Sequence, residues 1–258
     1  MNYKLILHFD INQTIIADDI SNNKEIEDGI LSCLADEVIV ESKTYKQYCE
    51  SIYPGISKEN KELRKKMIRD NLLNLSSESQ RKKYFLAKQN ASDSLIVKSF
   101  AKLIDFLKTN NIDFLLHLRT FGDDLDKVQS CVEKLLGAKM KYIETKNFTP
   151  FELSQLFKSQ HCAVKDDYNN WITHNKNCKY GKIFPLPQDE FVLCSFFDDN
   201  AYCNIISPMY ITNDSIVYQN PLPLITKAIH NVSILLALVN DDYFVDLLRP
   251  TLSFHKLI

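Results

Sequence analysis

Three short apolar runs along the chain are each followed at once by polar residues. They are residues 3–9 (YKLILHF), 113–120 (DFLLHLRT) and 191–197 (FVLCSFF). Nearly continuous apolar runs of this length are typical of strands that are buried on both faces of a parallel sheet. We therefore expect each run to be a central strand that brings its last residues to one edge of a sheet.

Helical patterns alternate with these runs. Residues 123–137 begin with two aspartates, carry apolar residues at helical spacing and stop at Gly137, which predicts a helix. Residues 138–144 predict another strand and residues 151–160 another helix. Strands that alternate with helices indicate an α/β fold with a doubly wound, mostly parallel, Rossmann-like sheet.

One long helical stretch interrupts this alternation. Residues 24–35 and 42–108 consist mainly of helix-forming residues, with apolar positions three and four apart. We therefore predict two parts: an α/β core of residues 1–18 and 99–258, and an inserted, mostly helical cap of residues 19–98.

The chain after residue 200 is less regular. It contains short strand-like pieces, two prolines and then an apolar segment, residues 225–239, which we predict to be a helix followed by a shorter last one.

Composition excludes several classes of function. The five glycines lie at least fifteen residues apart, so neither a GxGxxG nor a GxxxxGK loop is present. A formal net charge of −2 gives no general attraction to nucleic acid, and we expect no nucleic-acid partner. Seven cysteines, an odd number without a CxxC pair, predict reduced thiols. With neither a membrane-spanning run nor a signal-like segment, the chain is expected to be cytoplasmic; its oligomeric state is left open.

Polar side chains follow each of the three apolar runs. Asp10 and Asn12 follow the first, Thr120 ends the second, and Asp198 and Asp199 follow the third. Because the carboxyl ends of neighbouring parallel strands meet at one edge of a sheet, we expect these residues to converge. Several carboxylates at one point favour a bound divalent cation, and an all-oxygen donor set selects Mg²⁺ over Zn²⁺. Magnesium beside a hydroxyl donor predicts a phosphate ligand.

These segments together resemble the motifs of a known family. The order LILHFDINQT, FLLHLRT, a lysine and then LCSFFDDN is similar to the four motifs of the haloacid dehalogenase-like (HAD) superfamily. Members of that family are mostly magnesium-dependent phosphatases. The resemblance covers most of the chain outside the insertion, and the insertion falls at the position of the family's C1 cap.

The resemblance implies a role for each residue. Asp10 would be the nucleophile that becomes an aspartyl phosphate. Asn12 occupies the position of the acid/base, with its backbone carbonyl as a magnesium ligand, and Asp198 and Asp199 would bind or orient the ion. Thr120, together with Arg119 and a lysine, would bind the phosphate.

Two lysines could complete the site. Lys182 precedes the acidic pair by 16 residues and Lys165 precedes it by 33. We favour Lys182, because the acidic neighbours of Lys165, Asp166 and Asp167, indicate a surface turn or a salt bridge at that position.

Asn12 departs from the family pattern. Phosphatases of the family carry aspartate there, and an amide can neither protonate a leaving oxygen nor deprotonate water. We therefore expect a phosphatase that prefers aryl or acyl phosphates, such as phosphotyrosine or small phosphorylated metabolites, whose leaving groups need little protonation. The alternative is a catalytically impaired module that binds a phosphate or a partner. A response-regulator receiver is less compatible, because its acidic pair follows the first strand and its lysine comes last.

Overall fold

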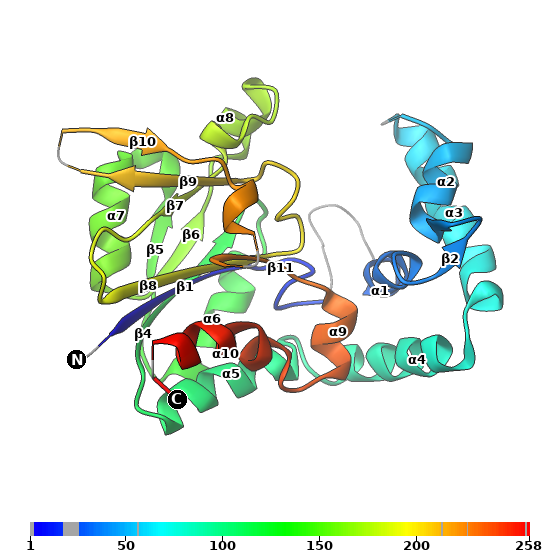
Figure 1. Cartoon of the computed structure of the whole chain (residues 1–258), viewed down its shortest axis with the longest axis horizontal. Coiled ribbons are helices and arrows are strands. Elements are labelled where there is room, and N and C mark those ends of the chain that lie inside the picture. The colour runs from blue at the N-terminus through cyan, green and yellow to red at the C-terminus, as the bar shows by residue number, and fades with distance from the viewer. Residues whose placement is uncertain (1–2, 18–25, 56, 213, 226, 256) are drawn as a thin grey trace.

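A parallel sheet of six strands forms the centre of the molecule (Figure 1). The computed structural model describes residues 3–17, 26–55, 57–212, 214–225, 227–255 and 257–258. The strand order is β11-β8-β1-β4-β6-β5, and every pair is parallel. This confirms the predicted Rossmann-like α/β class. The strands are β1 (Lys4–Asp10), β4 (Asp113–Thr120), β5 (Lys141–Glu144), β6 (Cys162–Lys165), β8 (Val192–Asp198) and β11 (Ile229–Asn231).

Alternate residues of β1 face two different layers. Leu5, Leu7 and Phe9 point into a core shared with α5 (Lys98–Thr109), α6 (Leu125–Leu136) and α10 (Tyr243–Phe254). The opposite face carries His8 and ends at Asp10. There α7 (Pro150–Ser159) covers the β5 and β6 side of the sheet.

A second, smaller sheet covers the β8 and β11 side of that same face. It contains β7 (Lys182–Pro185), β9 (Ile206–Ile211) and β10 (Ile216–Tyr218) in the order β10-β9-β7. Phe184 and Ile206 from this sheet pack with Phe196 and Ile229 of the central sheet. Short helical turns connect these parts: η2 (Thr145–Asn147), α8 (Tyr168–Thr173), η3 (Cys178–Tyr180) and η4 (Leu222–Leu224).

The expected helical insertion lies beside the sheet (Figure 1). Its described part contains α1 (Ile26–Ala35), the hairpin β2 (Ile39–Val40) and β3 (Lys43–Thr44), α2 (Tyr45–Ile52), α3 (Lys58–Leu75) and α4 (Glu78–Asp93). The predicted junction near residues 18 and 19 lies outside the described residues.

The insertion shares its core with the rest of the molecule. Tyr84 and Ala87 of α4 belong to the same hydrophobic cluster as Leu235 and Leu238 of α9 (Ile234–Val239). The side-chain amide of Asn90 donates a hydrogen bond to the Leu238 carbonyl at 2.7 Å. Apolar packing therefore fixes α4 against the body, in addition to the chain connections.

Several segments differ from the sequence prediction. Residues 225–239 were predicted to be one helix, and this is wrong: β11 occupies the middle and α9 begins only after Ser233, whose hydroxyl accepts from the Leu236 N–H. A short apolar run does not distinguish a buried strand from a helix, because both remove the same side chains from water. Strands β6 and β7, of four residues each, were not predicted.

No helix among the described residues is long and apolar enough to cross a membrane. All seven cysteines are free thiols.

Gly181 permits a close approach between η3 and the loop before β9. A Cβ atom on Gly181 would lie 2.2 Å from the Ile205 carbonyl oxygen, which accepts the Lys182 N–H at 2.7 Å. We expect Gly181→Ala to lower the free energy of unfolding by about 1–3 kcal/mol, because backbone must move. Gly29→Ala should cost less, since its Cβ meets only the end of the Gln13 side chain. Urea unfolding of both variants checks this; equal stability of Gly181→Ala and wild type would contradict it.

Candidate functional site

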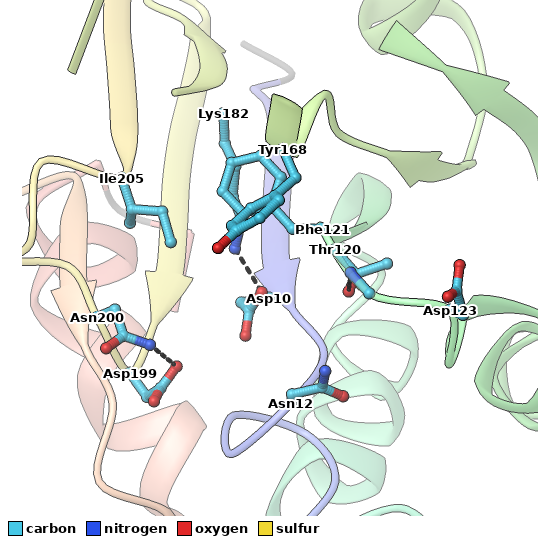
Figure 2. Close-up of a pocket in the computed structure, with 11 residues that line it drawn as sticks. Asp10, Asn12, Thr120, Phe121, Asp123, Tyr168, Lys182, Asp199, Asn200 and Ile205 are labelled. Carbon is cyan, nitrogen blue, oxygen red and sulfur yellow. Dashed lines mark hydrogen bonds and ion pairs between the residues drawn. The ribbon is translucent and has the colours of Figure 1, made fainter. Parts of the chain in front are cut away.

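The candidate site lies at the carboxyl ends of β1, β4 and β8. The chain enters β1 and later adds strands on both of its sides, so β1 is the point where the strand order reverses. Ligands of open α/β sheets bind outside such a point. A pocket of about 300 Å³ opens there (Figure 2). It is lined by Asp10, Asn12, Thr120, Phe121, Gly122, Asp123, Tyr168, Lys182, Asp199, Asn200 and Ile205.

Three carboxylates meet at this edge of the sheet. Asp10, Asp198 and Asp199 each offer an oxygen, and these oxygens lie within 4.8 Å of one another. Asp10 and Asp198 are buried, and Asp199 is partly exposed. Buried carboxylates this close repel one another, and a cation relieves the repulsion. An all-carboxylate set of oxygen donors fits a hard ion such as Mg²⁺.

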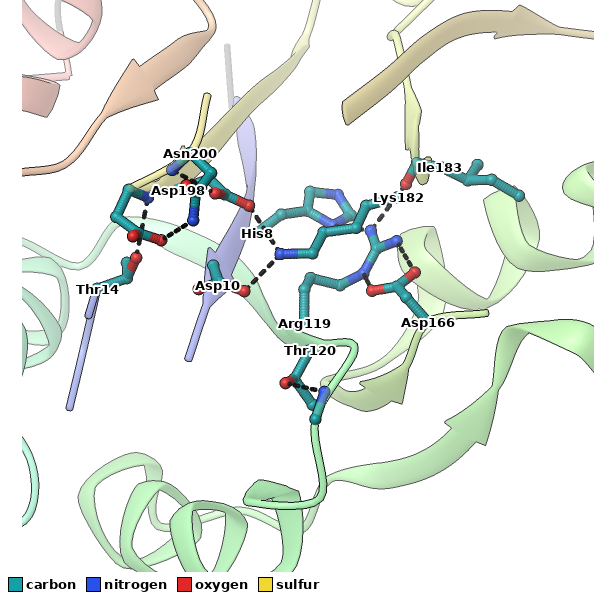
Figure 3. A network of polar contacts seen from close by, with 12 residues as sticks. His8, Asp10, Thr14, Arg119, Thr120, Asp166, Lys182, Ile183, Asp198 and Asn200 are labelled. Carbon is teal, nitrogen blue, oxygen red and sulfur yellow. Dashed lines mark hydrogen bonds and ion pairs between the residues drawn. The ribbon is translucent and has the colours of Figure 1, made fainter. Parts of the chain in front are cut away.

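Lys182 lies between two of these carboxylates. Its ammonium contacts Asp10 Oδ1 and donates to Asp198 Oδ2 at 2.7 Å (Figure 3). The side chain is fully buried, and it comes from β7 of the smaller sheet. Lys182 and the candidate nucleophile Asp10 lie 172 residues apart in the chain. The two sheets that carry them bring them into contact.

Burial and neighbouring charge act on this group together. Burial raises the pKa of Asp10 well above its usual value, the ammonium of Lys182 opposes the shift, and the carboxylates of Asp198 and Asp199 add to it. Burial by itself lowers the pKa of Lys182, but the carboxylates of Asp10, Asp198 and Asp166 outweigh it and raise that pKa. Lys182 therefore stays charged and partly neutralises the acidic cluster.

The loops around the pocket are fixed by short polar contacts. Thr120 Oγ1 accepts from the Gly122 N–H at 2.8 Å, which leaves its own O–H to donate elsewhere. Thr14 Oγ1 accepts from the Asp199 N–H at 3.2 Å, and this contact joins the loop after β1 to the loop after β8. Asn12 stands in the first of these loops and lines the pocket.

Arg119, which was expected to bind the phosphate, and Lys165, the alternative lysine, lie elsewhere. The Lys165 ammonium contacts Asp123 and does not line the pocket. Arg119 is completely buried, and its guanidinium donates to Asp166, His8 and the Ile183 carbonyl. The phosphate-binding role expected for Arg119 has no support in this position.

The sequence favoured packing over a stacking surface for Tyr168 and Trp171, whereas the structure places Tyr168 with Phe121 in an aromatic wall of the pocket. Phe121 stacks on Trp171 with ring centroids 5.4 Å apart and meets the Tyr168 ring edge-on at 5.6 Å. Trp171 is buried, as expected for a packing residue, whereas 47% of Tyr168 is exposed. The sequence signal was the spacing of Tyr168 and Trp171 directly after β6, but without that strand their place in the fold was unknown.

The helical insertion borders a neighbouring pocket. None of the described residues between 26 and 98 lines the site pocket. The neighbouring pocket is formed by Cys33 and Lys46 of the insertion together with Gln13, Asp199 and Asn200 of the body, so the two pockets share their acidic loop.

Comparisons of the chain with protein-family models, with curated proteins and with solved structures gave no match.

The two candidate lysines should differ strongly in their effect on stability. Lys182→Met removes the cation from a buried cluster, and we expect a loss of about 3–5 kcal/mol of unfolding free energy. Lys165→Met breaks only a surface ion pair and should cost about 0–1 kcal/mol. Urea unfolding of both variants and of wild type in the presence of EDTA measures the two losses of unfolding free energy.

The loss in Lys182→Met should also depend on pH. Without the ammonium the pKa of Asp10 in the folded protein rises further above the value of an unfolded aspartate, about 4. The folded state then holds a proton that the unfolded state releases, so stability falls as the pH rises above about 4. The loss should be larger at pH 8 than at pH 5; a loss independent of pH would contradict the direction of the Asp10 shift.

Proposed function

We propose that this protein is a magnesium-dependent phosphatase that acts through an aspartyl phosphate on Asp10, as in the HAD superfamily that its motifs resemble. One observation carries the proposal: three carboxylates with oxygens within 4.8 Å of one another, with a buried lysine in contact with two of them. A catalytic carboxylate, a site for a divalent cation and a fixed positive charge are the parts that phosphoryl transfer needs.

The ion would be held by Asp10, Asp198 and Asp199, with the Asn12 backbone carbonyl as a further ligand. When bound, Mg²⁺ supplies positive charge that neutralises the transferring phosphoryl group.

The side chains supply the remaining steps. A carboxylate oxygen of Asp10 attacks phosphorus while the bond to the leaving oxygen breaks, and the leaving group departs with the electron pair. Lys182 opposes the rise in the pKa of Asp10 and holds its carboxylate in position, and the Thr120 hydroxyl donates to a phosphoryl oxygen. Water then attacks the phosphorus of the aspartyl phosphate, its proton passes to solvent, and inorganic phosphate and the Asp10 carboxylate are regenerated.

Two features favour aryl phosphates as substrates. Asn12 cannot protonate a leaving oxygen, so leaving groups of low pKa such as phenolates are favoured over alkoxides. The exposed ring of Tyr168, which contacts Phe121 at the pocket wall, offers a surface on which an aromatic leaving group can stack. Phosphotyrosine or a small aryl phosphate meets both requirements.

A second function is supported by Asn12 itself. The same pocket with an amide at this position can bind a phosphorylated ligand without turning it over. Such a module would keep the metal and lysine contacts and would not form the covalent intermediate.

Single-turnover labelling tests the proposal against this alternative. The enzyme is mixed with Mg²⁺ and ³²P-labelled aryl phosphate and quenched in acid, and we expect one acid-stable, base-labile label per chain on Asp10. Asp10→Asn should carry none and should not release nitrophenol from p-nitrophenyl phosphate. A ligand that binds with Mg²⁺ but leaves no covalent label would overturn the phosphatase and support the binding module.

Restoring an acid at position 12 should widen the substrate range. We expect Asn12→Asp to raise kcat/KM for alkyl phosphates, which reports the formation of the aspartyl phosphate, by about 10²–10⁴-fold, because the leaving alkoxide then receives a proton. The gain on p-nitrophenyl phosphate should be much smaller, since its leaving group needs little protonation. Asn12→Ser, which has no comparable acid, is the control. Equal gains on both substrates would contradict this account of Asn12.

A further inference from the structure

Lys182 reaches the carboxylates from a sheet that is not theirs. Asp10 and Asp198 end strands of the central sheet, whereas Lys182 begins β7 of the smaller sheet. The position of its ammonium therefore depends on what fixes β7 against the central sheet.

Arg119 makes that connection with a charged group. One guanidinium nitrogen donates to the carbonyl of Ile183, the residue after Lys182, at 2.7 Å. Two others form a bidentate pair with Asp166, at 3.0 and 2.5 Å (Figure 3). A planar fork with five donors can satisfy these partners together, and lysine cannot.

Asp166 extends the connection to two other parts of the pocket. Its N–H donates to the Thr120 carbonyl at 2.7 Å, and its own carbonyl accepts the Tyr168 N–H at 3.1 Å. The carboxylate of Asp166 is also among the charges that favour the ammonium of Lys182.

The surroundings leave the guanidinium little freedom. Its central carbon lies 5.2 Å from the centre of the Phe157 ring and 5.4 Å from that of Phe196. Nη1 of Arg119, the nitrogen that donates to the Ile183 carbonyl, also lies 3.1 Å from His8 Nδ1. Burial, with His117 and Arg119 beside it, lowers the pKa of His8, so its ring is neutral and accepts that hydrogen bond. Arg119 and Asp166 are both buried within this shell.

We propose that the buried Arg119–Asp166 pair is a positioning pair, which holds β7 against β4 and thereby places Lys182 at Asp10. This assigns Arg119 to the support of the site and not to the phosphate itself. The consequence for catalysis rests on the proposed function, but the placement of Lys182 does not.

Acetylation of lysines tests the placement without any activity. Wild type and Arg119→Met are treated with a low concentration of acetic anhydride in EDTA, and labelling is read by mass spectrometry. Lys182 is buried and should be protected, whereas the side chain of Lys139 is 92% exposed and serves as the internal reference. We expect the ratio of Lys182 to Lys139 labelling to rise at least about tenfold in Arg119→Met, because loss of the buried pair frees β7.

Arg69→Met is the matched control. Arg69 forms a bidentate pair with Asp28 at 2.7 and 2.8 Å, but in the helical insertion. Its loss should leave the labelling of Lys182 at the wild-type level. If Arg119→Met fails to fold, by circular dichroism and Trp171 fluorescence, Arg119→Lys and Asp166→Asn apply the same test with smaller changes. A folded variant of the pair in which Lys182 stays as protected as in wild type overturns the proposal.

Kinetics separate this inference from the proposed function. If both hold, Arg119→Lys should lower kcat for p-nitrophenyl phosphate by about 10²-fold, as expected for a displaced catalytic group, while Arg69→Met should not. Exposure of Lys182 in an Arg119 variant, with no turnover by wild type, would support the pair and overturn the phosphatase. Turnover by wild type, with Lys182 protected in every folded variant, would support the phosphatase and overturn the positioning pair.

Discussion

A buried ammonium group between two carboxylates is the contact on which the site depends. Lys182 belongs to the smaller sheet, and its partners Asp10 and Asp198 end neighbouring strands of the central sheet. Burying these three charges is costly unless each is compensated. The smaller sheet must therefore lie where its lysine reaches the carboxylates at the edge of the central sheet. The third carboxylate, Asp199, is partly exposed and lines the pocket.

The polar side chains around and beneath the pocket form two adjacent layers. The layer at the pocket contains the carboxylates and Lys182, and the layer beneath it contains Arg119, Asp166 and His8. Under the proposed function, these fixed charges would need no reorganisation when a phosphoryl group binds, which is the basis of electrostatic catalysis. The lower layer is enclosed by Phe157 and Phe196, so its geometry is set by packing as well as by hydrogen bonds.

The helical insertion contributes to the surroundings of the site in a different way. It packs through α4 on α9 with a continuous apolar core, and its residues line a second pocket that shares Asp199 and Asn200 with the first. The wall closest to Lys182 is instead aromatic and comes from the body, where the Phe121 ring lies 5.4 Å from the ammonium. Under the proposed function, contacts to a leaving group on this side would therefore come from Phe121 and Tyr168.

The sequence by itself determined the central strands and the polar residues at their ends, because an apolar run that stops at Asp10 or Asp198 has one stable place in a parallel sheet. It also favoured Lys182 over Lys165, and the structure brings Lys182 to Asp10. Only the tertiary structure decided the partners of Arg119 and Asp166 and the place of Tyr168. These depend on β6 and β7, strands of four residues that hardly differ from loops in their own pattern, and on the packing of one sheet against another, which no local periodicity encodes.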